Sequence, residues 1–339
     1  MPLATTRANA SVLGLRGTRP PVQWVAGADN GALWTSTDRY ATNWVQETSS
    51  FGSTNINCVA TNGAGTWVAV GSGGKIASST DGKTWTQRTS GFSTSNILWV
   101  AYGGGTWVAV GAAGKVSTST NGTTWTAVAT GTSGWSASYG IGHVAYGNGN
   151  WVGINSNGTL KQTTDPTGAW TTRTEPLGTG QHYADYHPAI GSGIWTLGTE
   201  GGVSSGDLAS STDAITWTSR TPATSVQADT QFLAASNSTC ILAPAYDGTS
   251  WQIQKSTNGT SWSNVTEPTP AYGTIYFPAS AYRGHGDDIL VGIKSALTII
   301  TTSYFDTFWA TTDGSTFGDQ VSSLDMNHMV HRLGHQSIR

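Results

Sequence analysis

The chain has 339 residues, 10% of them charged, and a formal net charge of −3 at pH 7. Its 44 glycines and 16 tryptophans are typical of short, half-buried strands joined by tight turns. The scattered Lys and Arg form no basic stripe and no apolar run is long enough to cross a bilayer, so we expect no nucleic-acid partner and no membrane span. The start, MPLATTRANASVLGLRG, lacks the apolar core of a secretory signal, so we expect no signal peptide.

Two consecutive stretches of the chain have nearly the same sequence. GTWVAVGSGGKIASSTDGKTWT at 65–86 and GTWVAVGAAGKVSTSTNGTTWT at 105–126 carry the same residue at most of their positions. The first copy contains an alternating apolar run at 67–70, a glycine turn, a second alternating run at 75–79 and a Trp-led run. A further short run at 56–60 precedes it. The unit therefore predicts four short antiparallel strands.

A polar turn that ends in an aromatic residue occurs seven times, at nearly regular intervals along the chain. Four strands in about 40–45 residues are typical of a propeller blade. We therefore predict an all-β fold: a seven-bladed β-propeller of four-stranded antiparallel blades. It forms a single domain at 21–339, and residues 1–20 form an arm outside the ring. The turn aromatics are Trp44, Trp85, Trp125, Trp170, Trp217, Trp262 and Phe317.

These turns resemble the Asp box of the sialidase-like (BNR) propellers, whose pattern is Ser-x-Asp-x-Gly-x-x-Trp. Asp165 and Trp170 in TTDPTGAW keep the Asp-to-Trp interval of that pattern, whereas turns such as the one at Asp81 are one residue shorter. An Asp or Asn side chain here accepts N–H groups of its own turn, and the aromatic ring fills the space between blades. We therefore expect structural roles for Asp38, Asp81, Asn121, Asp165, Asp213, Asn258 and Asp313.

The two ends of the chain together complete one predicted blade. The first unit, PVQWVAGADNGALWTSTD, begins at the second strand of the repeat and lacks an innermost strand. Residues 327–334, after the last turn, align with the innermost strand at 96–103. We expect this C-terminal strand to join the first blade and close the ring, which removes an open sheet edge.

The family resemblance raises the question of glycan cleavage. A sialidase site requires three arginines that converge near the axis, but Arg88, Arg173 and Arg220 fall on predicted outermost strands. Arg283 falls in a predicted turn on the face of the boxes, and only Arg332 lies on a predicted inner strand. We therefore expect no sialidase activity.

A carboxylate-pair glycoside hydrolase on the same fold stays open as an alternative. Such an enzyme needs two acids about 5–9.5 Å apart across a cleft. No pair is indicated by its spacing, and scattered surface acids are the simpler interpretation. The acids on the face opposite the boxes are Asp29, Asp185, Glu200, Asp207, Asp229 and Asp247.

The histidines near the C-terminus, His328, His331 and His335, do not predict a metal site. The first two point to opposite faces of a strand, and no Cys or Glu completes a ligand set. Cys58 and Cys240 fall in different repeats, so we expect two free thiols. We expect no metal and no cofactor.

Long connections between blades, on the face away from the boxes, are the main candidates for recognition. TGTSGWSASYG, LGTGQHYADYHP and PTPAYGTIYFP carry Tyr and Trp, and the second also carries Asp and His. These rings either offer flat amphipathic surfaces to a sugar or a protein, or pack inward and cap the ring. The candidate residues are Trp135, Tyr139, His182, Tyr183, Asp185, Tyr186, Tyr272 and Tyr276.

A charge-poor chain rich in Ser, Thr, Gly and Asn, with a free arm and no signal peptide, resembles bacteriophage virion components. The resemblance predicts a non-enzymatic structural or binding propeller in the virion, as a tail or capsid decoration or a receptor-binding protein. Its partners would be other virion proteins, bound through residues 1–20, and a host surface glycan. The alternatives are the hydrolase and an assembly factor similar to the Asp-box protein that helps to build photosystem II, whose arginine-rich patch is missing here.

Overall fold

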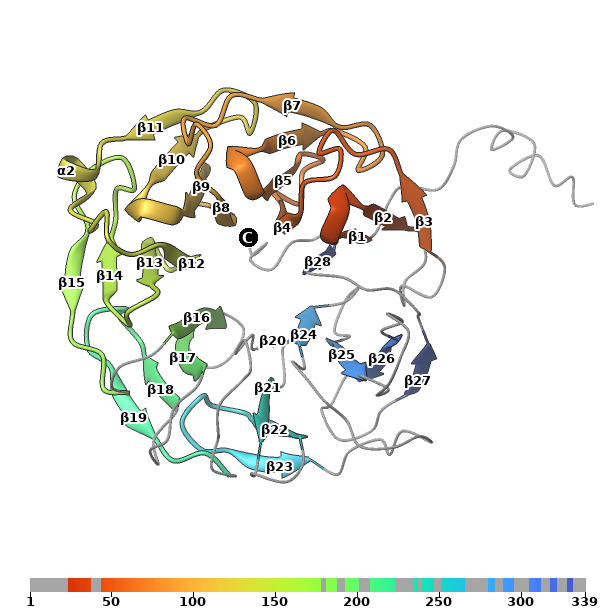
Figure 1. Cartoon of the computed structure of the whole chain (residues 1–339). Helices are drawn as coiled ribbons and strands as arrows, with labels where there is room; N and C mark the ends of the chain where they lie inside the picture. The colour runs from red at the N-terminus through yellow and green to blue at the C-terminus, as the bar shows by residue number, and fades with distance from the viewer. Residues whose placement is uncertain are drawn as a thin grey trace, which may run out of the picture.

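A computed structural model of the chain shows short strands arranged in a circle around a central axis (Figure 1). It describes residues 24–37, 44–177, 181–187, 193–200, 208–223, 235–236, 240–246, 251–265, 280–283, 289–295, 305–311, 318–321 and 328–331. Among the described residues, no helix is long and apolar enough to cross a membrane. The arm at 1–20 lies outside the described residues.

The described strands form seven four-stranded antiparallel sheets, in each of which the strands follow one another from the inner strand outward. The sheet that joins the two ends consists of β28 (His328–His331), β1 (Trp24–Gly27), β2 (Leu33–Ser36) and β3 (Trp44–Glu47). The next two consist of β4 (Ile56–Thr61), β5 (Trp67–Gly71), β6 (Ile76–Ser79) and β7 (Thr86–Arg88), then β8 (Ile97–Gly103), β9 (Thr106–Gly111), β10 (Val116–Ser119) and β11 (Thr126–Val128).

The other four sheets follow in chain order. They consist of β12 (Ile141–Gly147), β13 (Asn150–Asn155), β14 (Leu160–Thr163) and β15 (Thr171–Arg173), then β16 (Gln181–His187), β17 (Ile194–Glu200), β18 (Leu208–Ser211) and β19 (Thr218–Arg220). The last two consist of β20 (Ala235–Ser236), β21 (Ile241–Tyr246), β22 (Trp251–Ser256) and β23 (Ser263–Val265), then β24 (Ser280–Arg283), β25 (Ile289–Ser295), β26 (Phe305–Thr311) and β27 (Gly318–Val321).

The inner strands of neighbouring sheets lie against one another. β4 lies against β8, β8 against β12, β12 against β16, β16 against β20, and β20 against β24. β28 lies against both β24 and β4. β28 also pairs with β1 in antiparallel orientation, with Val330 opposite Val25. The described strands therefore give an all-β fold of four-stranded sheets around one axis.

The second strand of a sheet is buried on both faces because a neighbouring sheet packs against each face. In β5 and β9 the run Trp-Val-Ala-Val-Gly is buried throughout, whereas the outer strands β7 and β11 are mostly exposed. Trp107 packs with Cys58 and Val68 of the preceding sheet, and Val108 packs with Trp151 of the following one. The core thus lies in layers between sheets, and loss of one such Trp would cost about 3–5 kcal/mol.

The turns between second and third strands and the links from one sheet to the next share one side of the molecule, called the connection face below. In the turn η2 (Ser72–Gly74), Gly73 and Gly74 have φ values of +66 and +71°, as in a tight hairpin turn. The Ser90 hydroxyl donates to the carbonyl of Gly74 at 2.7 Å. A Cβ on Gly74 would lie 2.0 Å from the carbonyl oxygen of Ser93, so the link packs directly on the turn.

Other turns on the connection face repeat this geometry. They are η1 (Asp29–Gly31) and η3 (Ala112–Gly114), each with a residue of positive φ before its glycine. The link between β11 and β12 contains a single helical turn, α2 (Thr130–Ser133). These pieces hold the connection face in place in the first three sheets of the chain.

One predicted connection is instead a strand. The residues QHYADYH, expected in a loop, form β16 and pair along their whole length with β17. The prediction was wrong because the segment has no period-2 apolar pattern. Backbone hydrogen bonds hold the strand, and any residue except Pro can supply both the donor and the acceptor.

Candidate functional site

Short turns between third and fourth strands carry the predicted box residues and are called box turns below. In the turn between β6 and β7, Oδ1 of Asp81 accepts the N–H groups of Lys83 and Thr84 at 2.8 and 2.7 Å. Burial of the Asp81 carboxyl by itself raises its pKa, but these N–H groups and the hydroxyls of Ser79 and Thr84 outweigh burial and hold the pKa below its ordinary value. The carboxylate is thus engaged within its own turn.

Three more box turns are built in the same way. Asn121, Asp213 and Asn258 each accept two backbone N–H groups through Oδ1, at 2.8 to 2.9 Å. In the longer turn, Asp165 accepts the N–H and the hydroxyl of Thr167 at 2.9 and 2.6 Å. An amide oxygen therefore serves here as well as a carboxylate, so these turns require an acceptor rather than a charge. Two predicted box residues lie outside the described residues: Asp38 and Asp313.

The aromatic residues that end the box turns pack between sheets. Trp85 and Trp217 are 8% exposed and Trp170 is 4% exposed. The indole N–H of Trp85, Trp125 and Trp217 donates to a carbonyl of its own turn at 2.9, 3.2 and 3.3 Å. The Nε1 atom of Trp262 is buried but has no hydrogen-bond partner. Of the remaining two, Trp44 is half-buried at the start of β3 and Phe317 lies outside the described residues.

Trp135, a candidate either for recognition or for packing, is buried, with 4% of its surface exposed. Its ring packs on that of Trp170, with 5.8 Å between centroids. The Lys161 ammonium lies 5.1 Å from the Trp135 ring and donates to the carbonyl of Gly134 at 2.6 Å. Trp135 therefore fixes the link between β11 and β12 to the sheet beneath it and offers no ring face to a ligand.

Similar contacts of a buried aromatic residue and a lysine hold the two preceding links, from β3 to β4 and from β7 to β8. Phe51 and Phe92 are buried, and each N–H donates to the hydroxyl of the Ser two residues earlier. Lys75 and Lys115 donate to the carbonyls of these phenylalanines. The Ser-x-aromatic pattern that would have placed Trp135 in the scaffold recurs at 49–51, 90–92 and 133–135.

Tyr139 is the only predicted recognition residue that is exposed among those whose side chains the structure describes. It follows Trp135 in the link between β11 and β12 and is 42% exposed. Tyr272 and Tyr276 lie outside the described residues. The connection face therefore presents one aromatic candidate in its described part.

The other four candidates lie in the inner strand β16 rather than in a connection. Tyr186 stands opposite Trp195 in the register that places Tyr102 opposite Trp107. The Tyr that recurs near the end of these inner strands was the signal that the segment is a strand. The candidates in β16 are His182, Tyr183, Asp185 and Tyr186, and their side chains lie outside the described part.

The acids proposed for a hydrolase do not form a pair in the described strands. Asp185 stands opposite Thr196, while Glu200 stands opposite Gln181. Four residues of strand separate the two positions, about 13 Å at 3.3 Å per residue, beyond the roughly 5–9.5 Å of a carboxylate pair. Asp29 is exposed in η1. Outside the described residues lie Asp207, Asp229 and Asp247.

The arginines considered for a carboxylate-binding triad lie on three different outer strands. Arg88 donates through Nε to the Ser78 hydroxyl at 2.9 Å, and Arg220 donates in the same way to Ser210 at 2.7 Å. Arg173 donates to the glutamine side chain of β14 at 2.7 Å. Each guanidinium thus reaches across its own sheet to the third strand, so the three do not converge.

The remaining predicted candidates lie on inner strands or beyond the described part. Arg283, predicted in a turn, is the last residue of β24. His328 and His331 are the first and last residues of β28, three positions apart on the strand. Arg332 and His335 lie outside the described residues.

Both cysteines are buried and neither forms a disulfide. Burial raises the pKa of the Cys58 thiol to about 12, although a backbone hydrogen bond with Val100 opposes the shift. A thiol with so high a pKa carries almost no thiolate at neutral pH, so Cys58 is a packing residue. Within the described stretches no three His, Cys, Asp or Glu side chains gather as metal ligands.

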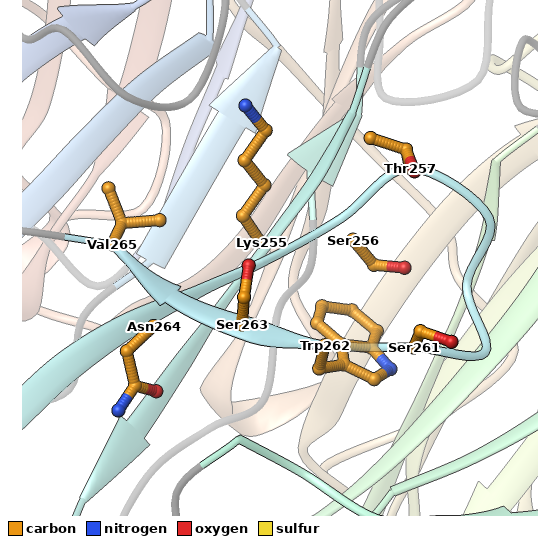
Figure 2. A pocket seen from close by; sticks show the side chains of 8 residues that line it. All are labelled: Lys255, Ser256, Thr257, Ser261, Trp262, Ser263, Asn264 and Val265. Carbon is orange, nitrogen blue, oxygen red and sulfur yellow. The ribbon is translucent and has the colours of Figure 1, made fainter.

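A pocket of about 480 Å³ lies beside the box turn between β22 and β23 (Figure 2). Lys255 stands opposite Ser263 on the paired strands, and the indole of Trp262 forms part of the wall. In Figure 2 the labelled side chains project to both sides of the hairpin: Lys255 and Val265 lie on one side and Asn264 on the other. The lining residues are Lys255, Ser256, Thr257, Ser261, Trp262, Ser263, Asn264 and Val265.

Comparison with known proteins shows the fold alone. No protein-family model and no curated protein matches the chain by sequence. Among solved structures, YCF48 bound to D1 peptide is 15% identical with a TM-score of 0.58, covering 84% of this chain and 91% of that one. YCF48 from Cyanidioschyzon merolae is 15% identical with a TM-score of 0.52, covering 80% and 86%. A chain of the mitotic checkpoint complex is 10% identical with a TM-score of 0.54, covering 86% and 92%.

The chain folds as a β-propeller. Its four-stranded sheets are the blades. In the blade of β16 to β19, Arg220 reaches across to Ser210 and fills the outer part of the sheet surface. In the blade of β20 to β23, the same two positions hold Val265 and Lys255. Valine is too short to make that crossing, and both residues line the pocket.

Sequence reasoning missed this pocket although a signal was present. The outer strands of three blades read Thr-Gln-Arg, Thr-Thr-Arg and Thr-Ser-Arg, whereas β23 reads Ser-Asn-Val. The lost arginine was visible in an alignment of the repeats. That its absence bears on the pocket could be recognised only from the contact that the arginine makes across the sheet in the other blades.

Proposed function

We propose that the chain is a non-catalytic binding propeller with seven blades, closed by the pairing of β28 with β1. The circle of neighbouring inner strands, in which β28 stands between β24 and β4, supports the closure. The box turns are proposed to be short Asp boxes of the sialidase-like type. Their side chains accept two N–H groups of their own turn, which is the role expected for that motif.

The observation that carries a binding role is that the described repeats use their polar groups internally. Asp81 and its counterparts hold box turns, the connection-face lysines hold links, and the outer arginines cross their own sheets. Asp185 and Glu200 stand too far apart along their strands for a carboxylate pair. A scaffold locked in this way suits presentation of a surface better than acid–base chemistry.

The location proposed for this propeller is a bacteriophage virion. Residues 1–20 would attach it to other virion proteins, and the ring would contact a host surface glycan or another protein. The charge-poor, Ser-, Thr- and Gly-rich composition supports this proposal. Tyr139, with its exposed ring on the connection face, is the described residue that we propose for such a contact.

A second candidate function is that of an assembly factor. YCF48 bound to D1 peptide has a fold similar to that of this chain, so a propeller of this shape can hold a peptide. The likeness is one of fold, which makes this candidate weaker than the virion proposal.

The test is quantitative mass spectrometry of purified phage particles from a host that produces the full chain, compared with a form that lacks residues 1–20. The proposal expects the full chain in particles at a fixed ratio to a capsid protein, and loss of the shortened form. Equal incorporation of both forms rejects the arm, and absence of both rejects the virion. Release of reducing ends from bacterial surface polysaccharide by the pure protein would reject the non-catalytic proposal.

A further inference from the structure

We infer that the link between β11 and β12 binds an N-acetylated sugar, whose acetamido group takes the place of an asparagine side chain that this link lacks. The inference rests on the proposed binding function and gives it a site and a ligand class. The site lies on the connection face, where the link passes over η3 and Tyr139 is 42% exposed. Its residues are Leu98, Ala113, Tyr139 and Gly140.

In each of the two preceding links, an asparagine caps the turn beside it. Oδ1 of Asn55 accepts the N–H of Asn30 in η1 at 3.0 Å, and Oδ1 of Asn96 accepts the N–H of Gly73 in η2 at 2.9 Å. Both asparagines directly precede an inner strand, and the carbonyl of Asn96 also accepts the N–H of Ala112 in the next turn at 2.9 Å. A carboxamide oxygen at this position is thus a repeated feature of the connection face.

The third link has Gly140 at this position. Its carbonyl accepts the N–H of Ser156 at 2.9 Å, so its backbone is placed as that of Asn96 is. Gly140 has no side chain to reach η3, and no group in the described part of the chain accepts the N–H of Ala113, the counterpart of Gly73. This N–H therefore takes its acceptor from outside the chain, from water or from a ligand.

The space left by the missing side chain has an apolar wall and a backbone wall. A Cβ on Gly140 would lie 3.3 Å from Cδ1 of Leu98 and 3.4 Å from Cα of Ala112. These separations are close to ordinary van der Waals contact, so a small group fits at this point without moving the backbone. A group that enters here therefore contacts the Leu98 side chain on one side and the turn η3 on the other.

The third link is also one residue longer than its counterpart, and the added length brings Tyr139 to the surface. The carbonyl of Ser93 lies against η2, and that of Ser136 lies in the same way against η3. Three positions separate Ser93 from Asn96, but four separate Ser136 from Gly140. In the described part of the chain the Tyr139 ring stacks on no other ring and its hydroxyl has no hydrogen-bond partner. The link thus presents a flat amphipathic ring directly before the missing cap.

An acetamido group matches the missing asparagine in both of its parts. Its carbonyl oxygen is the same kind of acceptor as Oδ1 of Asn96, so it suits the N–H of Ala113. Its methyl group suits the apolar wall formed by Leu98. The sugar that carries the group then lies beside Tyr139, whose ring offers an apolar face to the C–H side of a sugar.

Two other ligand classes fit the site less well. An acidic sugar needs a cation, but Lys115, which follows η3, already donates to the carbonyl of Phe92 and the hydroxyl of Ser95 at 2.9 and 3.0 Å. A peptide asparagine carries the same amide but has no apolar ring face joined to it for the Tyr139 ring to cover. An N-acetylated sugar has both, with the amide attached directly to the ring.

The first test compares two disaccharides on the full chain by isothermal titration calorimetry. Chitobiose is the probe, and cellobiose, which has the same linkage and hydroxyls in place of the acetamido groups, is its match. We expect chitobiose to bind about fivefold more tightly, the factor that one net hydrogen bond contributes. In protein labelled with ¹⁵N-alanine and ¹⁵N-glycine, chitobiose should shift the amide signal of Ala113 and leave that of Gly73, which Asn96 occupies. Equal affinities, or an unmoved Ala113 signal, overturn the inference.

The second test fills the site by copying the preceding link. Gly140→Asn restores the side chain that Asn96 provides, so we expect a folded protein that no longer binds chitobiose. Gly131→Asn is the matched control, because it makes the same substitution in the same link at a position where a Cβ meets nothing within 4 Å. The control should bind like the wild type. Retained binding in Gly140→Asn, or loss of binding in the control with an unchanged melting temperature, overturns the inference.

A third variant tests the ring without touching the cap. Tyr139→Ala removes an exposed side chain, so it should keep the wild-type melting temperature and weaken chitobiose binding several-fold. Unchanged affinity in this variant overturns the inference, and so does tighter binding of the capped peptide Ala-Asn-Ala than of chitobiose. A wild type that binds no chitobiose but still joins phage particles rejects this site and leaves the proposed function intact. Cleavage of chitobiose rejects the proposed function itself.

Discussion

Two adjacent glycines in one turn should respond very differently to the same substitution. In η2, Gly73 and Gly74 have nearly equal φ values, +66 and +71°, so an added Cβ causes similar backbone strain at both. A Cβ on Gly73 would meet nothing within 4 Å. A Cβ on Gly74 would lie 2.0 Å from the carbonyl oxygen of Ser93. The pair therefore separates local strain from packing of the link on the turn.

The magnitudes follow from these surroundings. Left-handed strain costs about 1–2 kcal/mol, and the stiffer unfolded chain returns about 0.4–1, so Gly73→Ala should lose about 1 kcal/mol. Gly74→Ala adds overpacking of about 1–3 kcal/mol and the loss of about 1 from the Ser90 hydroxyl bond to the Gly74 carbonyl. Its total loss should be about 3–5 kcal/mol. Ala113, with φ +58° in η3, takes the position that Gly73 takes in η2, so an Ala is tolerated there.

The assay is equilibrium urea unfolding followed by tryptophan fluorescence, with the two variants and the wild type measured together. Equal m-values are required before the midpoints are converted to free energies. We expect the free energy of unfolding of Gly74→Ala to lie about 2 kcal/mol or more below that of Gly73→Ala, because only the former is overpacked. Equal losses in the two variants would refute the reasoning, because they would mean that the link from β7 to β8 does not rest on this turn.

Three further predictions concern the box turns, the strained alanine and the chain ends. Asp81→Asn should leave the urea midpoint unchanged at pH 7, because Asn121 holds its turn with the same two N–H bonds. Because the pKa of Asp81 is lowered in the folded protein, its carboxylate adds stability above the unfolded pKa, and this stability is lost as pH falls through the folded pKa. Near pH 3 the variant should therefore be more stable than the wild type. Stability curves of the two proteins that stay parallel as pH falls would contradict this. Ala113→Gly should gain about 0.5 kcal/mol in the urea assay, since relief of left-handed strain exceeds the added chain entropy, and a loss of stability would contradict it. Truncation after Leu324 removes β28 from β1 and should lower the melting temperature by many degrees, whereas an unchanged value would show that this pairing does not hold the ring.

The regular blades could be predicted because their sequence is consistent at every level. In β5 and β6, alternating apolar residues, glycine turns and a Trp-led outer strand all indicate the same structure, and the strands begin and end within a residue of expectation. Alignment of the repeat also places a strand at 327–334, the range that contains β28. Blade count and closure stay predictions, supported by the order of the sheets.

The recognition residues could not be predicted from their own segments. Trp135 reads as an exposed loop aromatic until it is aligned with Phe51 and Phe92, and burial is then the common property of the three. The residues of β16 lack a period-2 apolar pattern, and the strand is recognised only from its backbone pairing with β17. In both places tertiary packing, rather than local preference, decided the structure.

The arginine contact that stabilises several blades is absent from the β20–β23 blade. The arginine that crosses a blade does two things: it satisfies a third-strand side chain and it covers the sheet surface, as Arg220 does with Ser210. In the β20–β23 blade, Val265 holds the arginine position and Lys255 holds the position of Ser210. The blade of β8 to β11 has Val128 at the arginine position with Thr118 on the third strand, so loss of the arginine alone does not supply a cation.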